Sequence, residues 1–310
     1  MRRMVALALF VLAIAAAAPL PAQQAPFFFI QLSDPQFGFF NNDIDFPQET
    51  ANFEFTVANV NRLKPDFVII TGDLVNKPGD PAQMAEYARI RKKLLPGIPV
   101  YEMPGNHDLE NAPTPETVKA YRATYGLDRY VFRHKNVLGI VLNSTVIHTP
   151  DKVSDELLAQ DAWLKAELAK AKTSDAKHII VFQHHPWFLA KADEDDSYFN
   201  VPKVRREPLL ALFREAGVKT LVSGHYHQNA VATDAGFEAI TTGAVGRPLG
   251  QSESGFRIFH VTDAAITHRY YNLGLIPTSI NAARGLGAAR GAAPTGAPAG
   301  APGRGSTPGR

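Results

Sequence analysis

Residues 100 to 108 read Val100-Tyr101-Glu102-Met103-Pro104-Gly105-Asn106-His107-Asp108. A short run suited to a buried strand leads into a turn that carries an amide, an imidazole and a carboxylate. The same arrangement recurs at four other places, where short apolar runs also end in side chains that bind metals. These other segments are Ser33-Asp34-Pro35-Gln36, Thr71-Gly72-Asp73, Gln183-His184-His185-Pro186 and Ser223-Gly224-His225-Tyr226-His227.

The five segments predict one site. In α/β proteins the ligand site lies beyond the carboxyl ends of the strands, so segments far apart in the sequence meet there. Each motif alone is weak, because Gly-Asp turns and paired histidines are common; their repetition at five strand ends carries the prediction. The chain has no cysteine, so a metal ion must be held by Asp, Asn, Gln, His or water.

Apolar runs and helical patterns alternate along the chain, which predicts a single α/β domain with extra strands at its end. Strands are expected at 27–32, 67–70, 100–103, 137–142, 179–182 and 220–222, and later at 237–241, 256–261 and 266–271. Helices are expected at 49–63, 81–94, 115–125, 155–172 and 207–216. The fourth helix is the clearest, with Ser154 as its expected N-cap and Leu157, Leu164 and Leu168 near one face.

The two ends of the chain differ in composition from the middle. Residues 1–22 have two arginines, a short apolar run and a small residue before Gln23, which predicts an export signal cleaved after Ala22. A retained N-terminal anchor is the alternative. In residues 281–310, 21 of 30 are Ala, Gly or Pro, and such a segment is expected to be a flexible tail. The predicted domain therefore spans residues 23–280.

The charge of this domain argues against a nucleic-acid partner. The two ends hold six of the 32 basic residues and no acid, so 26 basic and 30 acidic side chains leave the domain at −4. A nucleic-acid face needs clustered Lys and Arg, and none is evident. The apolar run at the N-terminus is short for a membrane span, and no stable span is expected after cleavage.

The ordered motifs resemble the calcineurin-like metallophosphoesterase superfamily, whose pattern is D-x-H, G-D, G-N-H-[DE], a mid-chain His and G-H-x-H. The resemblance covers about residues 27–272. A closer similarity, to a metal-dependent serine/threonine phosphatase of this superfamily, also includes Phe29-Ile30-Gln31, Phe37-Gly38, Asp193 to Asp196 before Tyr198-Phe199-Asn200, and His268 to Tyr271. The resemblance implies a four-layer α/β/β/α sandwich with a dinuclear metal centre.

The resemblance also implies roles for individual residues. Asp73 bridges two divalent ions, whose identity (Mn, Fe, Zn or Mg) stays open. Asp34 and His227 complete the first site, and Asn106, His184 and His225 hold the second. His107 then protonates or stabilises the leaving group, with Asp108 orienting it. The ions supply a bridging hydroxide for attack at phosphorus.

Gln36 departs from the superfamily, which has a histidine at this position, although the closer relative shares the glutamine. Its neutral oxygen is a weaker donor than imidazole, so the first site is expected to bind metal more loosely and to lean toward Mn or Mg. Alternatively, Gln36 only hydrogen-bonds a water on the metal. Partial occupancy of this site on purification is the resulting hypothesis.

The expected function is that of an exported metal-dependent phosphoric-ester hydrolase, a phosphomonoesterase in the first instance. The alternatives are a phosphodiesterase acting on cyclic nucleotides or glycerophosphodiesters, and a non-catalytic phospholigand-binding protein. Arg247 is expected to meet a substrate phosphate or to form a surface salt bridge. The acidic residues 193–196 are expected near the mouth of the site. His134, His148, His178, His260 and His268 lack motif context and receive no role.

Overall fold

The computed structural model describes residues 24–286. The predicted export signal, and the tail beyond Leu286, lie outside the described residues. Within residues 24–286, no helix combines the length and the apolar character that crossing a membrane requires.

One five-stranded sheet forms half of the structure. Its order is β11-β10-β1-β2-β3, with β1, β2 and β3 parallel and β10 antiparallel to both of its neighbours. The strands are β1 (Phe27–Leu32), β2 (Val68–Ile70), β3 (Val100–Glu102), β10 (Gly255–Val261) and β11 (Ile266–Asn272). The parallel strands therefore direct their carboxyl ends to the same edge of the sheet.

The other half is a six-stranded sheet of order β4-β5-β6-β7-β9-β8. Strands β5, β6, β7 and β9 are parallel, and the edge strands β4 and β8 run antiparallel to their neighbours. The strands are β4 (Tyr130–His134), β5 (Val137–Val141), β6 (His178–Phe182), β7 (Thr220–Ser223), β8 (Ala230–Asp234) and β9 (Phe237–Thr241). The domain thus contains two sheets, each with parallel strands at its centre.

Strand β1 shows why both faces of these sheets are apolar. Phe28 and Ile30 pack outward against the helices of their own half, whereas Phe27 and Phe29 point into the layer between the sheets. The ring of Phe29 stacks between Phe67 and Phe259, with centroid distances of 4.5 and 4.6 Å. Because successive side chains of a strand point to opposite faces, a strand covered twice is apolar throughout.

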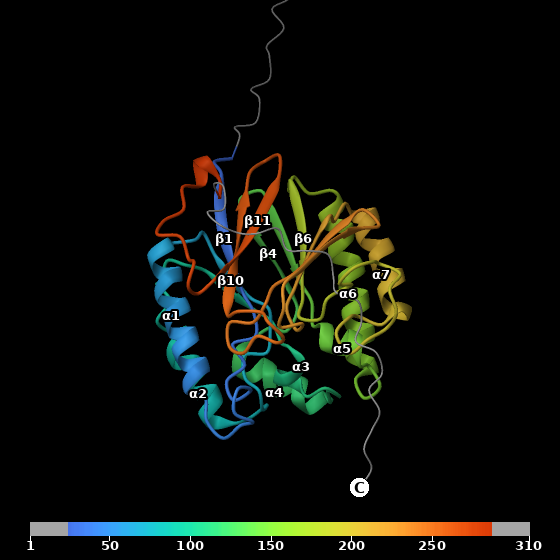
Figure 1. Ribbon diagram of the computed structural model, residues 1–310. Coiled ribbons are helices and arrows are strands. Elements are labelled where there is room, and N and C mark those ends of the chain that lie inside the picture. The colour runs from blue at the N-terminus through green and yellow to red at the C-terminus, as the bar shows by residue number, and fades with distance from the viewer. Residues whose placement is uncertain (1–23, 287–310) are drawn as a thin grey trace, which may run out of the picture.

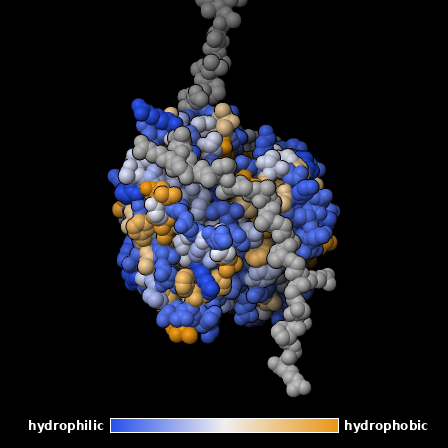
Figure 2. All heavy atoms as spheres, in the orientation of Figure 1, coloured by the Kyte–Doolittle hydropathy of each residue, from blue (hydrophilic) through white to orange (hydrophobic). Residues whose placement is uncertain are grey.

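Helices cover the outer face of each sheet, as Figure 1 shows. Helices α1 (Pro47–Leu63) and α2 (Pro81–Arg91) pack on the first sheet, and α6 (Ser154–Lys172) and α7 (Lys203–Ala216) on the second. Shorter helices lie in the connections: α3 (Asn106–Leu109), α4 (Pro115–Tyr125), α5 (Ser144–His148) and the 3-10 helix η1 (Ala282–Arg284). This is the α/β/β/α sandwich that the resemblance implied. Its visible face in Figure 2 is mainly hydrophilic, with hydrophobic residues scattered over it.

Several details differ from the sequence-based expectations; helix α7, for example, begins at Lys203 and not at residue 207. Helix α6 begins at Ser154 itself, with Val153 as the capping residue, and Leu157, Leu164 and Leu168 are buried as expected. Strands β4 and β8 were not expected. Helix η1 lies beyond the predicted domain boundary at residue 280, and the carbonyl of Ala282 lies 2.5 Å from Nε2 of His260.

Candidate metal centre

The five polar segments follow strands of both sheets and meet at one end of the sandwich. Strands β1, β2 and β3 lead to Asp34, Asp73 and Asn106, and β6 and β7 of the other sheet lead to His184 and to His225 with His227. All six side chains are buried. The structure therefore brings together residues that are up to 193 positions apart in the chain.

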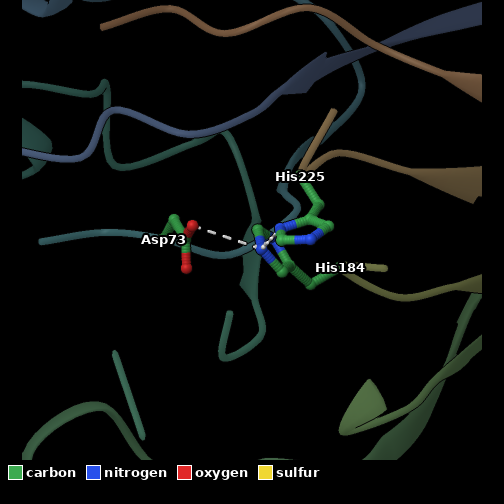
Figure 3. Close-up of side chains that lie close together, drawn as sticks. All are labelled: Asp73, His184 and His225. Carbon is green, nitrogen blue, oxygen red and sulfur yellow. Dashed lines mark hydrogen bonds and ion pairs between the residues drawn. The ribbon is translucent and has the colours of Figure 1, made fainter. Parts of the chain in front are cut away.

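One group of ligand atoms surrounds Nε2 of His184. This nitrogen lies 3.2 Å from Oδ2 of Asp73, 2.9 Å from Oδ1 of Asn106 and 3.1 Å from Nδ1 of His225. Figure 3 shows the two imidazoles and the carboxylate facing one another. Two carboxylate or amide oxygens and two imidazole nitrogens form a suitable donor set for a divalent transition metal. We call this group the second site.

A neighbouring group shares Asp73. The ligand atoms of Asp34, Asp73 and His227 all lie within 4.8 Å of one another, and Nε2 of His227 is 3.3 Å from Oδ1 of Asp34. Gln36 follows Asp34 in the same turn; its amide nitrogen donates to Oδ1 of Asn76 at 3.1 Å, and its buried Oε1 has no hydrogen-bond partner. A buried carbonyl oxygen without a donor is costly, and a cation would satisfy it. We call this group the first site.

The second nitrogen of each ligand histidine faces a backbone carbonyl. Nδ1 of His184 lies 2.8 Å from the carbonyl of Thr71, Nε2 of His225 lies 3.1 Å from that of Tyr198, and Nδ1 of His227 lies 2.5 Å from that of Arg247. A carbonyl only accepts hydrogen bonds, so each ring donates there, and in its neutral form it has its lone pair on the nitrogen that faces the site. The three rings are thus oriented so that their neutral forms would be the tautomers suited to binding a metal.

The charges of the site are strongly coupled. Burial alone would raise the pKa of Asp73, but the nearby His184 and His107 outweigh it and hold this pKa far below its usual range. Burial would likewise lower the pKa of His184, but the charge of Asp73 and the hydrogen bond between them raise it to about 9. Burial and the charge of His184 lower the pKa of His225 to about 3. In the metal-free protein a proton on His184 therefore balances the carboxylate.

The backbone at the ligands adopts an unusual conformation. Five ligand residues have a positive φ in the left-handed region, between 39° and 65°: Asp34, Gln36, Asp73, His225 and His227. Such conformations cost free energy in residues other than glycine and gather at functional sites. Gly105 permits a further close approach, because a Cβ there would collide with the carboxylate of Asp73. The chain thus accepts local strain where the ligands converge.

His107 and Asp108 have separate surroundings. The backbone N–H of His107 donates to Oδ1 of Asp73 at 2.8 Å, and its ring Nδ1 lies 2.9 Å from the carbonyl of Asn76, which leaves Nε2 for a ligand. The carboxylate of Asp108 instead accepts the backbone N–H groups of Gly105, at 2.8 Å, and of Leu74, at 2.9 Å. Asn76, rather than Asp108, therefore occupies the position that orients the His107 ring.

Burial and the charge of Asp73 raise the pKa of Asp108 to about 8. Because Asp108 contacts the backbone of both the 72–75 loop and the 105–108 loop, it stabilises the position of these two loops relative to each other.

Several residues around the site were not found by sequence reasoning or have another role than expected. Asn111 accepts the amide of Asn106 at 2.8 Å, and the hydroxyl of Tyr198 lies 3.3 Å from the same nitrogen, so both keep Oδ1 of Asn106 directed at His184. No local motif identifies Asn76 or Asn111, and Tyr198 belongs to a quoted motif that gave it no role, because each acts through contacts across the fold. Arg247 donates to the carbonyls of Phe39 and Phe40, at 3.1 and 3.3 Å. Among residues 24–286 these bonds take the place of the expected surface salt bridge, and the contact with a substrate phosphate stays a prediction.

The acidic segment 193–196 is more ordered than a solvated loop. Glu194 accepts backbone N–H groups of Leu189 and Ala190, both at 2.8 Å, and the side-chain amide of Asn200 at 2.7 Å. Because Tyr198 reaches His225 from this loop, the segment lies near the mouth of the site, as expected.

Comparison with known proteins agrees with this fold. The profile of the family described as calcineurin-like phosphoesterase matches residues 29–229. The chain belongs to this family and is a metallophosphoesterase, a hydrolase of phosphoric esters. It is 39% identical to the serine/threonine-protein phosphatase CPPED1 of Rattus norvegicus over 263 residues, which are 80% of this chain and 84% of the relative. The resemblance inferred from the motifs is thereby confirmed.

Two more distant proteins are also similar to this chain. A probable cyclic nucleotide phosphodiesterase of Vesicomyosocius okutanii is 27% identical over 58% of this chain and 70% of its own length. A solved structure of a dimetal phosphatase from Danio rerio superposes with a TM-score of 0.54 at 15% identity, covering 80% of this chain and all of that one. The latter supports the fold alone.

Proposed function

We propose that this protein is an exported phosphomonoesterase that uses two divalent cations. The observation that carries the proposal is the gathering of three ligand atoms within 3.2 Å of Nε2 of His184, beside a second group that shares Asp73. The buried, unpartnered oxygen of Gln36 supports a cation at the first site as well.

Asp34, Gln36, Asp73 and His227 would hold the first ion, and Asp73, Asn106, His184 and His225 the second. When bound, such a pair of ions lowers the pKa of a shared water and stabilises charge on the phosphoryl oxygens. The protein supplies a fixed, buried set of donors whose orientation is set by backbone carbonyls. Little reorganisation is then required when substrate arrives.

His107 is the candidate acid for the leaving alcohol. Its Nδ1 donates to the carbonyl of Asn76, so in the protonated ring Nε2 carries the proton that an alkoxide needs. The ring is partly exposed, in contrast to the buried metal ligands, and so remains open to a substrate. General acid catalysis of this kind contributes about a hundredfold or more to the rate.

The named activity of the 39% identical relative, a serine/threonine phosphatase, favours a monoester substrate. The weaker similarity to a probable cyclic nucleotide phosphodiesterase supports the alternative, since the same pair of ions serves both ester classes. The acidic residues 193–196 near the mouth disfavour highly anionic substrates.

An aryl phosphate monoester and the matching diester, each with added Mn²⁺, separate these two activities. We expect turnover of the monoester, and a loss of about a hundredfold or more in kcat for His107→Gln with metal content unchanged. His178→Gln is the matched control, because His178 lies at the other end of β6 and contacts the carbonyl of Thr262. Turnover of the diester alone would overturn the monoesterase proposal.

Loose binding at the first site is also part of the proposal. Gln36 offers a neutral oxygen where an imidazole would bind more tightly, which favours Mn²⁺ or Mg²⁺ there. We expect purified protein to hold clearly fewer than two ions per chain, and Mn²⁺ to restore activity. Two ions retained after extensive chelation would contradict this.

Export rests on residues 1–22. Expression of the full chain in a Gram-negative host should yield a periplasmic product whose N-terminus is Gln23. A product that retains Met1 and stays with the membrane fraction would support the alternative of a retained anchor.

A further inference from the structure

Arg247 connects two of the loops that form the first site, the loop that carries His227 and the loop that follows β1. It lies in the loop between β9 and β10, and its backbone carbonyl accepts the Nδ1–H of His227 at 2.5 Å. Its guanidinium donates to the carbonyls of Phe39 and Phe40 in the loop that follows β1. A single residue thus holds a ligand histidine with its main chain and the Gln36 loop with its side chain.

The aromatic rings strengthen this connection. The guanidinium carbon of Arg247 lies 5.2 Å from the ring centre of Phe39 and 5.4 Å from that of Phe40. The other side of Phe39 faces the site, with its ring 5.1 Å from the ring of His227 and 6.2 Å from that of His107. Movement of the guanidinium would therefore free a ring that packs against both a ligand and the candidate acid.

The main chain next to Arg247 also contacts the loop that follows β1. The N–H groups of Val245 and Gly246 donate to the carbonyls of Ser33 and Asp34, at 2.8 and 3.0 Å, and the N–H of Leu249 donates to the carbonyl of His227 at 3.2 Å. Residues 245–249 thus pair with the segment that carries Asp34 on one side and with His227 on the other. Arg247 adds the contacts to His227 and to the carbonyls of Phe39 and Phe40.

We propose that Arg247 is a positioning residue for the first metal site, setting the affinity of that site for its ion by fixing His227 and the 36–40 loop relative to Asp34. This inference rests on the proposed two-ion centre. The second site has its own supports, the carbonyls of Thr71 and Tyr198 and the side chain of Asn111, none of which contacts Arg247. The effect of Arg247 is therefore confined to one of the two ions.

The positioning role depends on the planar shape of the Arg247 guanidinium and not on its charge alone. A lysine ammonium would keep the charge, but it lacks the planar fork that spans two carbonyls while lying against two rings. Arg247→Lys should therefore behave as a loss of positioning. Residues that orient a metal ligand in this way typically contribute a factor of 10 to 100 in metal affinity.

The test is Mn²⁺ binding to the purified mature chain, measured by calorimetry and by ions per chain after gel filtration. Wild type is expected to show two binding events. Arg247→Lys should weaken only the looser event, by about tenfold or more, and leave the tighter one unchanged. The matched control is Arg214→Lys, because Arg214 also donates to a backbone carbonyl, that of Ala235 at 2.9 Å, and lies 5.4 Å from the ring of Phe237. Phe237 begins β9, at the end of the sheet away from the site.

A second variant covers the case in which Arg247→Lys does not fold. Phe40 is 47% exposed, so Phe40→Leu should fold normally while removing one of the two rings that hold the guanidinium. We expect about a threefold loss at the looser site. Unchanged affinities in both variants would overturn the role of Arg247 while leaving the two-ion centre intact. A wild-type protein that binds no Mn²⁺ would overturn the metal centre and the inference together.

Discussion

At the scale of residues, the proposed histidine and asparagine ligands each have two polar atoms. One atom faces the site, and the other forms a hydrogen bond that fixes the orientation of the side chain. Asn106 illustrates this, because its amide nitrogen is held by Asn111 and Tyr198 while its oxygen faces His184. Motifs in the sequence identify the ligands, since these occur at fixed places after strands. They do not identify Asn111, and they do not show the supporting roles of Tyr198 and Arg247, because these roles depend on contacts between distant segments.

Replacing Asp108 by alanine should destabilise the protein rather than remove a step of the reaction. The carboxylate accepts N–H groups from Leu74, Val75 and Gly105, and the loss of these bonds would leave several buried donors unpaired. Each unpaired donor costs about 1–3 kcal/mol, so we expect a loss of about 3 kcal/mol or more in the free energy of unfolding. Denaturant titration measures it.

Asp151→Ala is the control for this substitution, because Asp151 is an exposed aspartate in a turn. An Asp108→Ala protein as stable as the control would show that these hydrogen bonds contribute little.

Metal affinity should rise with pH below about pH 9. The charge of Asp73 raises the pKa of His184 to about 9, above its usual 6.5, so at neutral pH the ring holds a proton that an incoming cation must displace. For one released proton, the affinity increases about tenfold per pH unit until the pKa is passed. Mn²⁺ titrations at pH 6, 7 and 8 test this, and an affinity independent of pH would contradict it.

At the scale of elements, the site is built from the turns that follow parallel strands. Residues with a left-handed φ gather in these turns, at Asp34, Gln36, Asp73, His225 and His227, as such conformations often do at functional sites. Small residues beside them allow the turns to touch. Strand β7 ends at such a place, where Gly224 precedes His225 and packs against the loop of β1.

Gly224→Ala should disturb both stability and metal binding. A Cβ at this position would collide with Oγ of Ser33 and lie 2.7 Å from Oδ2 of Asp34. Overpacking of this kind costs about 1–3 kcal/mol, and relief of the clash would displace a first-site ligand. Thermal melting and Mn²⁺ binding measure the two effects. Gly97→Ala is the control, because nothing lies within 4 Å of a Cβ there, and equal behaviour of both variants would refute the argument.

The strands differed in how well the sequence predicted them. The central strands are continuous apolar runs because they are covered on both faces, and they were expected within a few residues of their observed bounds. Strands β4 and β8 are the two edges of the second sheet, and each has only one buried side chain, Phe132 and Ala232 respectively. A strand buried at a single position leaves little periodicity to detect.

At the scale of the whole molecule, each of the two proposed metal sites would draw ligands from both sheets. Asp34, Asp73 and Asn106 follow strands of the first sheet, whereas the ligand histidines follow strands of the second. The division into two sheets could not be read from the apolar runs, since a twice-covered strand looks the same in either sheet. It came from the family resemblance, and the structure confirms it.

Removal of metal should therefore lower the stability of the entire domain. An ion that binds only the folded chain at a hundred times its dissociation constant adds about 2.7 kcal/mol. For a domain of this size we expect chelation to lower the Tm by about 5–10 °C. Calorimetry with and without EDTA tests this, and Mn²⁺ in excess should reverse the change. Equal Tm values with and without EDTA would show that metal binding does not stabilise the domain.

The most direct test of the central claim is anomalous diffraction from crystals of the mature chain grown with Mn²⁺. The account predicts two anomalous peaks about 3.5–4 Å apart on either side of the Asp73 carboxylate, one also within coordination distance of Asp34 and His227 and the other of Asn106, His184 and His225. Strong peaks elsewhere with none beside Asp73 would contradict it.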